Sequence, residues 1–68
     1  MYRNTQRFEI TEEQYNKLKT LNEFERVHFF EDNFPKYGYY FISYGVLGVF
    51  AEEEDGCYYC VVALGSSD

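Results

Sequence analysis

Asp55-Gly56 is the feature that most restricts how this 68-residue chain can fold. An Asp-Gly pair strongly favours a two-residue β-turn, because both residues tolerate the positive φ angles that this turn requires. The pair separates two runs rich in apolar and aromatic residues, Val46–Glu52 and Cys57–Leu64. We therefore predict an antiparallel hairpin with three cross-strand pairs: Glu54 with Cys57, Glu52 with Tyr59, and Phe50 with Val61.

Two further segments are candidates for the same sheet. Tyr39–Tyr44 is rich in residues that favour strands, and Tyr44-Gly45 after it is expected to form a tight turn into the hairpin. Arg7–Ile10 is a candidate for a fourth strand. The C-terminal half is therefore expected to be an antiparallel meander.

Helix signals lie in the N-terminal half. Thr11 is a suitable N-cap, and Gln14 three residues later completes a capping box. Ile10 and Tyr15 have the spacing of a hydrophobic staple around that cap. We predict a helix over residues 12–21.

The next segment allows two interpretations. Asn22–Glu25 repeats the cap-then-Glu pattern, and Phe24, Val27 and His28 share a helical face, so a second helix or a bent continuation to about residue 31 is expected. Val27–Phe30 is also rich in strand formers, which leaves a strand as the alternative. Pro35 ends the segment in either case, because proline disfavours helix for itself and for the residue before it.

These elements predict one α+β domain over residues 1–68, with N-terminal helical segments packed on one face of a three- to four-stranded antiparallel sheet. A chain this short has a thin core and often needs a staple or a partner. Two cysteines are too few for a disulfide framework, so the seven Phe and eight Tyr rings must supply the buried area.

The strand pattern divides the sheet residues between two faces, because side chains alternate along a strand. The expected core face comprises Tyr40, Ile42, Leu47, Val49, Ala51, Tyr58, Cys60, Val62 and Leu64. The opposite face comprises Tyr39, Phe41, Gly48, Phe50, Tyr59, Val61 and Ala63, bordered by Glu52 and Glu54. It is nearly as apolar as the first, so we expect a partner or a second copy to cover it, or else the N-terminal strand or Phe29–Phe34 of the same chain. A slip of one residue at either turn would exchange the faces.

Charge restricts the class of partner. Twelve acidic and six basic residues give a formal net charge of −6, which opposes direct binding to nucleic acid or to an anionic membrane. All six basic residues lie within the first 36 positions, and residues 37–68 carry five acids and no base. We expect an acidic pole in the C-terminal half. With no targeting segment and no apolar run long enough to span a membrane, the expected location is the cytoplasm, with reduced thiols.

The residues that most often carry chemistry give no catalytic pattern. Cys57 and Cys60 have C-x-x-C spacing, but within a strand the two thiols point to opposite faces, which favours structural cysteines over a redox pair. Zinc needs about four ligands, and His28 is the single histidine, without a motif that would make it a base. We expect no catalytic residue, no metal and no cofactor.

In size, acidity and composition the whole chain resembles the small inhibitor proteins that phages encode, anti-CRISPR proteins among them. The net charge of −6, the base-free C-terminal half and the aromatic face beside the charge run Glu52–Asp55 predict a non-enzymatic protein-binding module, and the resemblance supports this prediction. We expect an inhibitor that docks on a basic, nucleic-acid-handling surface of a partner, with mimicry of nucleic acid by its acidic residues as one mode, in the host cytoplasm if the chain is phage-encoded. The alternatives are a small homodimeric structural or interaction protein and, third, a thiol redox protein. The predicted contact residues are Tyr39, Phe41, Phe50, Glu52, Glu53, Glu54, Asp55 and Tyr59.

Overall fold

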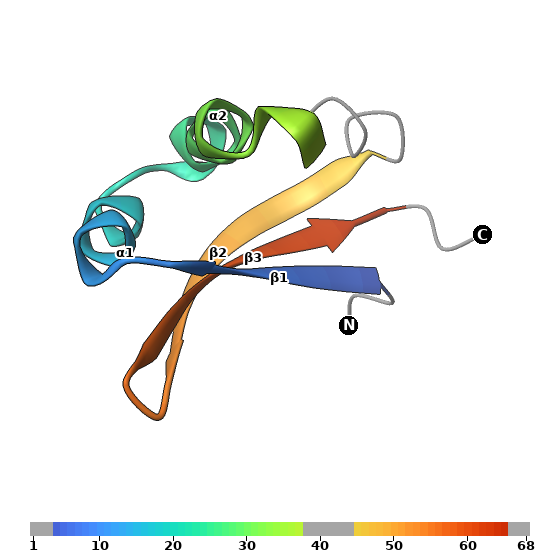
Figure 1. The fold of residues 1–68 in the computed structure, drawn as a ribbon. Coiled ribbons are helices and arrows are strands. Elements are labelled where there is room, and N and C mark those ends of the chain that lie inside the picture. Colours follow the sequence, from blue (N-terminus) through green and yellow to red (C-terminus); the bar gives the residue numbers. More distant parts are fainter. Residues whose placement is uncertain (1–3, 38–44, 66–68) are drawn as a thin grey trace.

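Two helices cover one face of an antiparallel sheet in the computed structural model, which describes residues 4–37 and 45–65 (Figure 1). Within the described residues the sheet has three strands in the order β1-β3-β2, so β3 is central and antiparallel to both neighbours. The predicted α+β class and the helical layer on one face are confirmed. The elements are β1 (Asn4–Ile10), α1 (Glu12–Lys19), α2 (Glu23–Asn33), β2 (Val46–Glu54) and β3 (Cys57–Leu64).

The hairpin forms in the predicted register. Asp55 and Gly56 have φ angles of 54° and 82°, the two positive values of a type I′ turn. Because the turn takes only these two residues, β2 continues to Glu54, two residues beyond the predicted end. The three predicted cross-strand pairs are all present: Glu54 with Cys57, Glu52 with Tyr59, and Phe50 with Val61.

The pairing of β2 with β3 is irregular between Val46 and Gly48, and this corrects one predicted core residue. A bulge places an extra residue on one strand and turns its side chain away from the regular alternation. Leu47 is consequently 60% exposed, although it was expected in the core. Val46 packs against the core instead.

Both predicted helices are present, and each begins with a capping box. In α1 the Thr11 hydroxyl accepts from the Gln14 N–H, and the Gln14 side chain accepts from the Thr11 N–H. Asn22 and Glu25 make the same reciprocal pair at the start of α2, so the second segment is a separate helix and the alternative strand is excluded. α1 ends at Lys19, two residues before its predicted end, because Thr20–Asn22 form the connection.

The strand predicted over Tyr39–Tyr44, with its turn at Tyr44-Gly45, lies outside the described residues, as do Tyr40 and Ile42 of the expected core face. The predicted fourth strand over Arg7–Ile10 is confirmed as part of β1, which begins at Asn4 and pairs with β3 along its whole length.

The core lies between the helices and one face of the sheet. Phe30 of α2 is 1% exposed and packs against the rings of Phe8 and Phe34 at centroid distances of 5.3 and 5.6 Å. The buried cluster comprises Ile10, Leu18, Phe29, Phe30, Val49, Cys60, Val62 and Leu64.

The outer face, which is the sheet face away from this core, is more covered than the apolar pattern indicated. Val61 and Ala63 are buried although they lie outside the core cluster. Both belong to the central strand: Arg7 and Phe50 lie on either side of Val61, and Thr5 and Gly48 lie on either side of Ala63, with the Phe50 ring over Gly48. β1 thus flanks these two residues from within the sheet.

Candidate functional site

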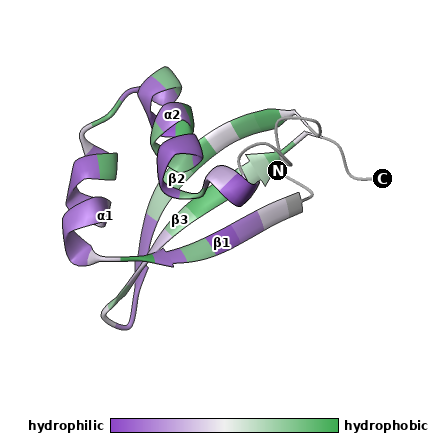
Figure 2. Cartoon of the chain, turned by 45° about the horizontal axis from the view of Figure 1, so that its top comes forward, coloured by the Kyte–Doolittle hydropathy of each residue, from purple (hydrophilic) through white to green (hydrophobic). Residues whose placement is uncertain are grey.

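Six of the chain's twelve carboxylates lie around the free end of the hairpin, which we call the acidic hairpin end: Glu9, Glu12, Glu52, Glu53, Glu54 and Asp55. In Figure 1 the hairpin projects past α1 and β1, and Figure 2 shows that this end is hydrophilic whereas the middle of β3 is hydrophobic. β1 brings Glu9 opposite Tyr59. Glu12, in the first turn of α1, lies near Tyr58 and helps to raise the pKa of its hydroxyl. The acidic hairpin end is thus assembled from three elements.

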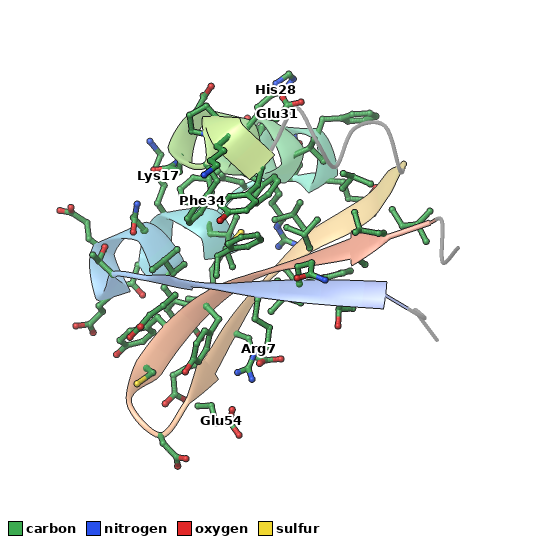
Figure 3. All side chains as sticks on the ribbon, turned by 45° about the vertical axis from the view of Figure 1, so that its right-hand side comes forward. Arg7, Lys17, His28, Glu31, Phe34 and Glu54 are labelled. Atoms are coloured by element: carbon green, nitrogen blue, oxygen red, sulfur yellow. The ribbon has the colours of Figure 1, made fainter. Side chains whose placement is uncertain are left out.

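Arg7 of β1 organises the outer face of this end. Its Nη2 lies 2.7 Å from Oε1 of Glu52 and 3.0 Å from Oε1 of Glu54, and its guanidinium carbon lies 4.1 Å from the centre of the Tyr59 ring. Figure 3 shows Arg7 and Glu54 extending toward each other beside the hairpin. Arg7 of the same chain therefore occupies the position beside Glu52 and over the Tyr59 ring, both of which were predicted to contact a partner.

The surroundings of this end raise the pKa values of Arg7, Tyr59 and Tyr58. The hydrogen bond to Glu54 raises the pKa of Arg7, since it favours the charged guanidinium. Removal of its ring from water raises the pKa of Tyr59, and the neighbouring Cys57 adds to this. For Tyr58 the pKa is raised by the same desolvation and then by Glu12. Both tyrosines are therefore neutral rings at physiological pH.

Two carboxylates at the tip of the hairpin itself, Glu53 and Asp55, are not paired with Arg7. Glu53 points to the other face of β2 and accepts a hydrogen bond of 2.9 Å from the N–H of Gly56. Asp55 occupies the left-handed position of the turn and is exposed. A cation approaching the tip of the hairpin would meet these two groups first.

The structure brings most of the predicted contact residues together. Phe50, Glu52 and Glu54 alternate along the outer face of β2, and Tyr59 lies opposite Glu52 on β3. Tyr39 and Phe41 lie outside the described residues. Sequence reasoning missed Arg7, and the register of β1 against β3 was the information needed to find it, because that register sets Arg7 opposite Val61 and beside the hairpin carboxylates.

The remaining candidate residues have structural surroundings. Cys57 and Cys60 are free thiols, and burial in the core raises the pKa of Cys60 to about 12, so its reactive thiolate is absent at neutral pH. His28 is an exposed residue of α2 whose Nδ1 lies 3.3 Å from Oε1 of Glu31 (Figure 3). Across residues 4–37 and 45–65, no cluster of three acidic, histidine or cysteine side chains is arranged to hold a metal ion.

Comparison with family models, with curated proteins and with solved structures finds no match to this chain, so its function is inferred from its own residues. None of the helices in the described part is long and apolar enough to cross a membrane.

Arg7→Gln tests how much the ion pairs of Arg7 with Glu52 and Glu54 stabilise the fold. We expect a lower unfolding midpoint, by roughly a few degrees, because Glu52 and Glu54 lose their shared cation and repel each other. The ion pairs are half exposed, so salt screens them and the difference from the parent chain should shrink toward 1 M salt, where the Debye length is about 3 Å. Thermal melts by circular dichroism at low and high salt measure both effects. A difference independent of salt would mean that Arg7 acts through packing alone.

Proposed function

We propose that this chain is a non-enzymatic protein-binding module whose acidic hairpin end docks on a basic surface of a partner protein. The observation that carries the proposal is the gathering of Glu9, Glu12 and Glu52–Asp55 from three elements at one projecting end. Such a concentration of one charge raises the rate at which an oppositely charged surface is met.

The ion pairs of Arg7 determine which of these carboxylates are available to a partner. Since it already pairs with Glu52 and Glu54, a basic residue must compete with Arg7 to reach either one. Glu53 and Asp55 offer charge without that competition. The hairpin tip is therefore the centre of the proposed contact, and Tyr59 lies beneath Arg7 at its border.

The acidic charge of the hairpin end indicates the class of partner that it would bind. Proteins that handle nucleic acid present basic grooves, and an acidic module bound there would exclude the nucleic acid and act as an inhibitor. This agrees with the resemblance to small phage-encoded inhibitors. We place the chain in the cytoplasm, that of the host if it is phage-encoded.

The test removes the tip charges without altering shape. Asp55→Asn keeps a residue that tolerates the left-handed turn, and Glu53→Gln keeps an acceptor for Gly56. We expect the double variant, E53Q/D55N, to bind the partner roughly tenfold more weakly and with a shallower salt dependence. The partner is captured from host lysate with the full chain, and the purified pair is then measured by calorimetry across a salt series.

E31Q/D32N on α2 is the matched control, because it changes the net charge equally on another element. It should leave the affinity within about twofold. Equal losses in the two double variants would reduce the effect to net charge and contradict docking at the hairpin. Displacement of the chain by single-stranded DNA is expected for a nucleic-acid-handling surface, and its absence would contradict the inhibitor function while leaving the docking intact.

A further inference from the structure

A groove of about 240 Å³ lies between the start of α2 and the Val46 end of β2, and we call it the α2–β2 groove. The residues that line it include Phe24, Arg26, Val27, Val46, Leu47 and Phe50. Its volume is below the range of roughly 300–1,000 Å³ that is usual for small-molecule sites. It is better suited to one large side chain than to a cofactor.

Three large apolar side chains are exposed at the rim of the groove. Phe24 is 80% exposed, Leu47 is 60% exposed and Phe50 is 36% exposed. Leu47 is turned out by the bulge, and Phe24 lies in the first turn of α2, beyond the buried residues of that helix. Large apolar side chains that gather around a concave site mark an interaction surface, whereas single exposed ones are ordinary.

The positive charge of Arg26 indicates which charge a group that occupies the groove should carry. Arg26 is half-buried, lines the groove and makes no ion pair with any residue that the structure describes. A carboxylate is the group that matches the fork of a guanidinium. The groove therefore fits an apolar side chain with a carboxylate beside it.

The rim of the groove itself carries such a pair of groups, an apolar side chain with a carboxylate beside it. Phe24 is preceded by Glu23, an exposed residue that also lines the groove, whereas the carboxylate of Glu25 is held by the capping box. A surface that carries both the inserted group and the receiving groove is self-complementary, as a two-fold dimer requires.

We propose that a second copy of this chain docks on the α2–β2 groove. Phe24 of each copy enters the groove of the other, against Leu47 and Phe50, and Glu23 of each copy accepts hydrogen bonds from the Arg26 guanidinium of the other. The groove lies toward the Val46 end of β2 and the acidic hairpin end lies at the other, so the dimer leaves both hairpin tips available.

Sedimentation equilibrium of the full chain tests the dimer. We expect the parent chain to dimerise at micromolar concentration and Phe24→Ser to weaken dimerisation by about 30-fold or more, the range of an interface hot spot. E23R and R26E should each weaken it, and the double swap E23R/R26E should restore it, because the charge pair is re-formed with exchanged signs. Circular dichroism melts establish that each variant is folded.

His28→Ser is the matched control, since His28 is an exposed residue of the same helix that does not line this groove. It should leave the dimer unchanged. A parent chain that stays monomeric at high micromolar concentration overturns the proposal, as does a dimer that is insensitive to Phe24→Ser or a double swap no better than its single variants. E53Q/D55N should dimerise normally, so failure of the dimer and failure of hairpin docking are separate results.

Discussion

Phe30→Ala is expected to unfold most of the chain at 37 °C. Phe30 is 1% exposed and its ring packs against Phe8 of β1 and Phe34, so removal of the ring leaves a cavity where helix and sheet meet. Truncating a buried Phe costs about 3–5 kcal/mol. A domain of this length has a total stability of roughly 3–10 kcal/mol, at about 0.05–0.15 kcal/mol per residue. Urea titrations followed by far-UV circular dichroism measure the loss.

Phe24→Ala provides the control for that experiment. It deletes the same ring from the same helix, but at a position that is 80% exposed. At protein concentrations below those at which the proposed dimer forms, we expect a change within about 0.5 kcal/mol, as for most surface substitutions. Similar losses of stability in Phe24→Ala and Phe30→Ala would contradict the difference in burial between the two rings.

Local signals made most of the fold predictable. The capping pairs Thr11 with Gln14 and Asn22 with Glu25 each join residues three positions apart. Their hydrogen bonds are local and do not depend on tertiary contacts. Asp55-Gly56 acts in the same way, because positive φ angles at both residues are enough to set the hairpin register. Such signals identify elements and short-range pairing.

The errors arose where contacts join distant parts of the chain. Leu47 was expected in the core because strict alternation assigns it there, and the bulge that exposes it is set by the pairing of β2 with β3. Val61 and Ala63 are covered because β1, more than fifty residues away in sequence, pairs on the other side of β3. Alternation along one strand contains no information on which strands flank it.

The same limit applies to the candidate site. Glu52–Asp55 are consecutive and were visible as a charge run, whereas Arg7 reaches Glu52 and Glu54 only through the fold. Phe24 was assigned to a shared helical face with Val27, yet Val27 is half-buried against the core and Phe24 is exposed, because α2 turns its first residues past the edge of the core. Among the described residues, exposed large apolar side chains therefore gather at the α2–β2 groove, and Phe50 belongs both to this groove and to the outer face.

Alkaline pH is expected to destabilise the fold through Cys60. The thiol is buried in the core, and this raises its pKa from 9.0 to about 12. Above pH 9 the unfolded chain releases the thiol proton while the native chain retains it, so the native state binds more protons and stability falls as pH rises. The loss is absent below pH 9 and amounts to at most about 1.4 kcal/mol for each pH unit between 9 and 12. The raised pKa values of Tyr58 and Tyr59 act in the same direction.

Cys60→Ala isolates the contribution of that thiol. The variant should be less stable than the parent chain at pH 8, because it leaves a small cavity beside Val62, but its stability should fall less steeply between pH 9 and 11. Urea titrations at each pH measure the free energy of unfolding. Parallel pH curves for the parent chain and Cys60→Ala would assign the alkaline loss to the tyrosines instead, because the alanine variant has no proton to retain at position 60.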